Sequence, residues 1–92
     1  MTILRDPSSP AADPEALALS VLGWILSDGD RAGRLLALTG LTPDDLRVSI
    51  GERATLAAVL DFLGAHEPDL IAAADALGVS PQALVEARER LA

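Results

Sequence analysis

The stretch Gly40-Leu41-Thr42-Pro43 decides the fold, because it recurs thirty-eight positions later as Gly78-Val79-Ser80-Pro81. In each copy a glycine that can end one helix precedes a hydroxyl residue and a proline that can begin the next. The same offset pairs Trp24 with Phe62, the only aromatic residues of the chain. A repeat of this length predicts small helical units that bury their apolar faces against each other.

The composition agrees with a purely helical protein. Half of the 92 residues are hydrophobic but only 2% are aromatic, and there is no tyrosine. A core of leucine, valine, isoleucine and alanine favours close helix packing over a sheet. The fold class expected is therefore all-α, a compact bundle of about six short helices in two pseudo-repeated three-helix units.

The chain is expected to form one domain after a short arm. Residues 1–12 contain Pro7-Ser8-Ser9-Pro10 and no apolar period, which indicates a flexible N-terminal arm. Residues 13–92 are expected to form a single helical domain, with the pseudo-repeats at 17–54 and 55–92.

Capping residues and apolar spacing place the helices. Asp13 before Pro14 predicts the first helix start, Gly29 its stop and Asp30 the cap of the next helix. The first and fourth helices are apolar over most of their circumference and are expected in the middle of the bundle. The expected helices are 14–27, 31–39, 43–50, 52–65, 68–78 and 81–91.

The net charge of −7 restricts the partners. An acidic surface repels phosphate backbones and anionic lipids, which argues against nucleic acid and membranes as partners. Residues 1–7 lack the layout of a signal peptide, and the apolar stretch 16–26 is too short for a membrane span. We therefore expect a cytoplasmic protein.

Residues 70–91 resemble a DNA-binding helix-turn-helix, with Ala74, the turn residue Gly78 and Leu84 at suitable spacing. The second helix of this segment would, however, present Glu86 and Glu89 to the phosphates, and these carry the wrong charge. The simpler interpretation is that this helix-turn-helix shape serves only to pack its helices within the fold. A divergent helix-turn-helix regulator remains the alternative function.

No catalytic, metal or cofactor site is expected. The chain has no cysteine, and His66 is its only histidine, expected either to cap the carboxyl end of the fourth helix or simply to be exposed. Residues 28–30 lack the further acids of a calcium loop. Asp61 and Asp75 are expected to face water, and no nucleophile, base and orienting group occur together.

A non-catalytic protein–protein interaction or regulatory module is the function expected. The mean hydropathy of +0.33 is high for so small a chain, which favours an exposed apolar face for another protein or a second copy. Trp24 and Phe62 are expected in the core, meeting near the axis between the two units. The expected partner surface consists of Arg31, Arg34, Val85 and Arg88.

Several segments resemble a family of short, acidic, all-helical proteins of alphaproteobacteria, catalogued as a domain of unknown function. The resemblance implies a bacterial, cytoplasmic setting and adds no activity, cofactor or site. It covers nearly the whole chain except the arm and is carried by residues 16–19, 34–41, 44–46, 58–63 and 77–81.

Overall fold

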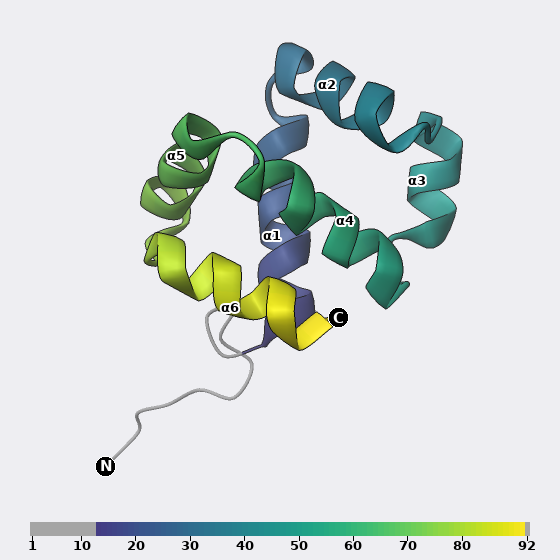
Figure 1. The fold of residues 1–92 in the computed structure, drawn as a ribbon. Coiled ribbons are helices and arrows are strands. Elements are labelled where there is room, and N and C mark those ends of the chain that lie inside the picture. Colours follow the sequence, from purple (N-terminus) through teal and green to yellow (C-terminus); the bar gives the residue numbers. More distant parts are fainter. Residues whose placement is uncertain (1–12, 92) are drawn as a thin grey trace.

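The computed structural model describes residues 13–91, and the arm expected over residues 1–12 lies outside this range. The described residues form six α-helices and no strand, which confirms the prediction of an all-α bundle (Figure 1). The helices are α1 Pro14–Leu26, α2 Gly29–Thr39, α3 Pro43–Ser49, α4 Arg53–Gly64, α5 Glu67–Leu77 and α6 Pro81–Leu91.

Helices α1 and α4 form the centre of the bundle, as expected. They pack against each other, and both also contact α2, α5 and α6 (Figure 1). Most of the buried side chains come from these two helices, and no polar or charged residue between positions 13 and 91 is buried. The largest fully buried side chains are Leu17, Ile25, Leu35, Leu56, Leu63 and Leu84, with Val21 and Val59.

The repeated stretch ends one helix and begins the next in both places. Gly40 follows α2 with a φ of 74°, and Gly78 follows α5 with a φ of 71°, a left-handed conformation that favours glycine. The side-chain oxygens of Thr42 and Ser80 each accept a hydrogen bond, at 3.0 Å, from the backbone N–H three residues later.

The boundary between α1 and α2 differs from the prediction. The N-cap of α2 is Asp28, whose carboxylate accepts a hydrogen bond of 3.0 Å from the backbone N–H of Arg31. Gly29 is therefore the first residue of α2, and Asp30 lies in its first turn. An aspartate at position 28 or at position 30 could serve as the N-cap, so the residue type alone does not distinguish the two. The structure shows that Asp28 is the cap.

Two of the three helix starts repeat at the offset of 38, but the packing of the third helix does not repeat. Helices α2 and α5 begin 38 positions apart, as do α3 and α6. However, α6 packs broadly on α1, α4 and α5, whereas α3 has no comparable contact with another helix. Leu46 is the single buried residue of α3. The superposition of residues 17–54 on 55–92 stays a prediction.

The two aromatic residues occupy different environments. Phe62 is buried in the core, as expected, whereas Trp24 is partly buried and packs at the edge of the core. Within residues 13–91 no single helix is long and apolar enough to span a membrane. Helices α5 and α6 have the length and apolar composition of a membrane span only when they are taken together, and the pair is bent by 101°.

Two glycine substitutions should have opposite effects on stability. Gly78→Ala forces a left-handed φ on an alanine and should lower the free energy of unfolding by about 1–2 kcal/mol. Gly23 lies inside α1, and no atom lies within 4 Å of the place that an added methyl group would occupy, so Gly23→Ala should raise stability by about 0.5–1 kcal/mol. Urea unfolding monitored by circular dichroism measures both, and equal signs would contradict the assignment of Gly78.

Candidate interaction surface

All charged groups of the described chain lie on its surface, so any site must be built there. Three carboxylates cap helices: Asp13 caps α1, Asp28 caps α2, and Asp45 completes a capping box with Thr42 on α3. These groups satisfy backbone N–H groups at helix starts and are therefore structural. The remaining charges form ion pairs or face solvent.

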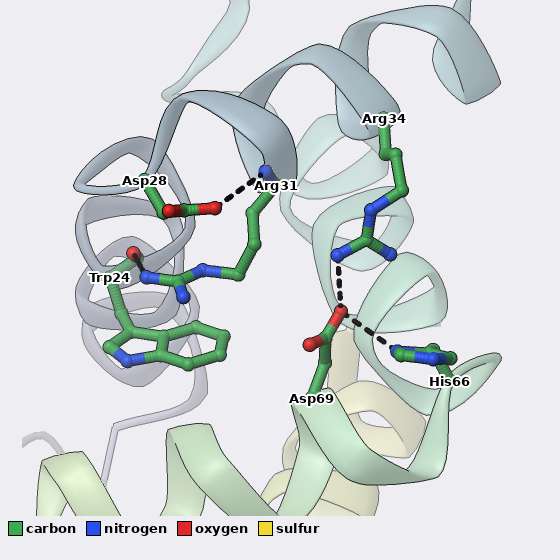
Figure 2. Close-up of polar contacts among 6 residues, drawn as sticks. All are labelled: Trp24, Asp28, Arg31, Arg34, His66 and Asp69. Atoms are coloured by element: carbon green, nitrogen blue, oxygen red, sulfur yellow. Dashed lines mark hydrogen bonds and ion pairs between the residues drawn. The ribbon is translucent and has the colours of Figure 1, made fainter.

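Arg31 stabilises the turn between α1 and α2 by contacts with the end of α1. Its guanidinium lies 3.7 Å from the centre of the Trp24 ring, and its Nη2 donates a hydrogen bond of 2.8 Å to the Trp24 carbonyl (Figure 2). The same Nη2 also donates to the Ser27 Oγ at 3.1 Å. The cation thus binds the carbonyl end of α1 and covers the indole at the same time. The Arg31 Nε–H is buried without a hydrogen-bond partner, so the stacking has to offset its desolvation.

Arg34 and His66 share one carboxylate. The Arg34 Nη2 lies 2.9 Å from the Asp69 Oδ2, and the His66 Nδ1 lies 3.0 Å from the same oxygen (Figure 2). The Asp69 side chain is only 13% exposed, and its burial raises the pKa, but the hydrogen bonds and charges of Arg34 and His66 outweigh this and hold the pKa of Asp69 below its ordinary value. This cluster ties α2 to the start of α5.

His66 is exposed, which is one of the two alternatives expected for it, but it does not cap the carboxyl end of α4. It occupies the N-cap position of α5 but makes no side-chain capping bond there. Its ring is directed to Asp69 in the first turn of α5 rather than to the carbonyl end of α4. A carboxylate one turn away is a stronger acceptor than a helix carbonyl, which explains the difference.

Two further arginines join helices that are distant in sequence. The Arg88 Nε on α6 donates to the Asp61 Oδ1 on α4 at 2.6 Å, and this hydrogen bond and charge raise the pKa of Arg88. Arg53 on α4 pairs with Glu15 on α1 at 3.1 Å and also donates to the carbonyl of Arg90. Each of these exposed ion pairs adds little stability, but it keeps the arginine bound to a group of the same chain.

The charges left without a partner are all negative. Every arginine between positions 13 and 91 has an interaction partner. Six carboxylates in the same range make no hydrogen bond or ion pair, so the free charge of the surface is acidic. These residues are Asp30, Glu52, Glu67, Asp75, Glu86 and Glu89.

A first apolar groove lies between α2 and α4. Its two adjoining hollows, of about 390 and 520 Å³, share Leu38, Phe62 and Ala65. Leu38 is 68% exposed beside it, which is unusual for so large an apolar side chain. We call it the α2–α4 groove, defined by Arg34, Leu38, Leu41, Ala58, Phe62 and Ala65.

A second groove of about 420 Å³ lies on the other side of α4, against α6 and the start of α5. Val85 is 46% exposed on its rim, and Ala65 also borders the first groove. We call it the α4–α6 groove, defined by Leu60, Asp61, Leu70, Leu84, Val85 and Glu89. A third apolar hollow, of about 430 Å³, lies among α1, α2 and α3.

The four residues expected at the partner surface do not form one patch. Val85 and Arg88 line the α4–α6 groove together. Arg34 lines the α2–α4 groove, and Arg31 lines neither, because it is stacked on Trp24. The basic spot expected from Arg31 and Arg34 is neutralised by a helix end and a carboxylate.

Sequence reasoning missed Leu38 and Asp69. Leu38 continues the apolar spacing of Leu35, yet Leu35 is buried and Leu38 is exposed. Helical periodicity alone does not separate them, because residues three apart share a face. Asp69 meets Arg34 from 35 positions away, and no local pattern indicates that contact. Only the approach of α5 to α2 brings the two together.

Catalytic candidates are not gathered in the described part of the chain. Asp61 pairs with Arg88, His66 with Asp69, and Asp75 is exposed on α5. Within residues 13–91, no three histidine, aspartate or glutamate side chains lie close enough to hold a metal ion.

Removing Arg31 should weaken the α1–α2 turn. Arg31→Ala loses the ring stacking and the bond to the Trp24 carbonyl, so the free energy of unfolding should fall by about 1–2 kcal/mol. Emission from Trp24, the single tryptophan, should shift at the same time. Arg47→Ala is the control, because Arg47 is exposed and bonds only to Asp44 in its own helix. Equal effects of the two substitutions would disprove this role of Arg31.

The Asp69 cluster should make stability depend on acid pH. A carboxylate with a lowered pKa stabilises the fold fully above its unfolded pKa, near 3.9, and loses this contribution as pH falls through the folded value. Asp69→Asn should therefore cost about 1 kcal/mol at pH 7 and almost nothing near pH 2. Urea unfolding across that pH range tests this.

Asp75→Asn serves as the matched control, because Asp75 lies on the same helix and makes no ion pair. Its effect should stay within about 0.5 kcal/mol at every pH. A difference between wild type and Asp69→Asn that does not change with pH would show that Asp69 acts without its charge.

Comparison with known proteins agrees with the resemblance seen in the sequence. No curated protein and no solved structure matches the chain. Residues 11–92 match the profile of one family, described as a protein of unknown function, DUF3572. Because the match covers the whole described helical bundle, the chain belongs to the DUF3572 family.

Proposed function

We propose that this protein is a non-catalytic interaction or regulatory module that presents apolar grooves to another protein or to a second copy. The observation that carries the proposal is the pair of grooves on either side of α4, each bordered by an exposed large apolar residue, Leu38 or Val85. Exposed apolar hollows of this kind mark interfaces in small proteins.

The surrounding polar groups support the same interpretation. Each groove has an ion pair at its edge, Arg34 with Asp69 and Arg88 with Asp61, which holds the rim in place. Neither arrangement sets a nucleophile beside an activated base. A rigid apolar floor with a polar rim is the usual anatomy of a protein interface.

A helix-turn-helix regulator is the second candidate. Helices α5 and α6 are bent by 101°, which is within the range of that motif. The exposed side of α6 nevertheless carries Glu86 and Glu89, and Arg88 is held by Asp61. Counterion release needs free cations at this surface, so the electrostatics favour a protein partner.

Apolar-to-acidic substitutions in the grooves should weaken partner binding. Leu38→Asp or Val85→Asp should weaken capture of a partner, or concentration-dependent self-association, by at least tenfold, because each replaces an exposed apolar contact of the groove with a charge. Affinity capture and sedimentation equilibrium measure the two. Val48→Asp is the control, since Val48 is exposed on α3 and lines none of the three grooves.

A protein that captures nothing and sediments as a monomer at every concentration would contradict the proposed function. A salt-dependent mobility shift with DNA that is weakened by Arg88→Ala would favour the helix-turn-helix regulator instead.

A further inference from the structure

We propose that the α4–α6 groove binds an amphipathic helix that carries lysine or arginine beside its apolar side chains. This inference rests on the proposed function and names the chemistry of the partner. It depends on the apolar lining of the groove, on the sign of its charges and on what those charges exclude.

The groove offers an apolar lining that the apolar side chains of a helix could contact. Its floor is formed by Leu60, Leu70 and Leu84, and Val85 stands on its rim. Gly64 and Ala65, which carry little or no side chain, also line it. Leucine-sized side chains one turn apart on an incoming helix would fill such a hollow, as in other helix-in-groove complexes.

The charge of the groove is negative. Asp61 lies in its wall and neutralises Arg88, the only cation that lines it, at 2.6 Å. Glu89 lines the groove as well and makes no ion pair in the described part of the chain. One unopposed carboxylate therefore faces any helix that enters.

The carboxyl end of α4 adds to this negative charge. Gly64 and Ala65, where α4 ends, line the groove, and the last turn of α4 contains no basic residue. A helix end without a cation carries a partial negative charge that attracts ammonium and guanidinium groups. Glu89 and this helix end together favour a basic partner by charge complementarity.

The same charges disfavour the other occupants. A second copy docked in a symmetric manner would place one acidic groove against another, in a chain of net charge −7. DNA would bring phosphates to the same carboxylates. A basic amphipathic helix matches both the apolar floor and the charge.

Two synthetic helical peptides test the inference on the full-length protein. One has leucine at positions i, i+3, i+4 and i+7 with lysine on the flanks, and the other has glutamate in place of every lysine. The lysine peptide should bind, move the NMR signals of Leu60, Val85 and Glu89, and lose affinity as salt is added. The glutamate peptide should bind at least tenfold more weakly.

Matched variants locate the site. Glu89→Lys and Val85→Asp should each weaken binding of the lysine peptide at least tenfold. Glu86→Lys makes the same charge change on α6 outside the groove lining, and Ile71→Asp places the same acid on an exposed site of α5, so both should bind as wild type does. Thermal unfolding checks that all four variants fold, as expected for exposed positions.

Equal binding of the two peptides, or binding unaffected by Glu89→Lys, would overturn the inference. So would a dimer in sedimentation whose interface signals map to this groove. A natural partner whose capture survives Val85→Asp and Glu89→Lys but is lost with Leu38→Asp would also overturn it, while the proposed function would stand. Failure of the proposed function is measured separately, by capture and sedimentation without any peptide.

Discussion

The packing of α1 across α4 is the interaction on which the rest of the structure depends. Both helices are apolar over most of their circumference, so each buries side chains against several neighbours at once. No polar or charged residue in 13–91 is buried in this core, and its stability therefore comes from the burial of apolar side chains, Phe62 included. Chemistry and recognition are in consequence confined to the outer surface of the bundle.

The arginines on that surface interact with other groups of the same chain. Arg31 closes the turn after α1, and Arg34 and Arg88 tie α2 and α6 to carboxylates on neighbouring helices. With these cations committed, the free charges of the described surface are carboxylates. The acidic composition of the chain is thus reflected in unpaired carboxylates on the described surface, which is the basis on which a basic partner is proposed.

Membership of the DUF3572 family gives this protein relatives without an assigned activity. The features that suggest a use are the two grooves beside α4, where large apolar side chains such as Leu38 and Val85 are exposed. Burying them against another protein would remove from water apolar area that the small core does not cover.

Local sequence determined the helices, since capping residues and turn glycines act within a few positions and do not depend on the rest of the chain. Gly40 and Gly78 end helices at the positions that the repeat predicts. The apolar residues around most of the circumference of α1 and α4 predict that these two helices are central, and they are. The packing of the helices determined three features that local sequence does not specify: the exposure of Leu38, the stacking of Arg31 on Trp24 and the ion pair of Arg34 with Asp69. These contacts depend on how helices cross, and helical periodicity does not specify the crossing.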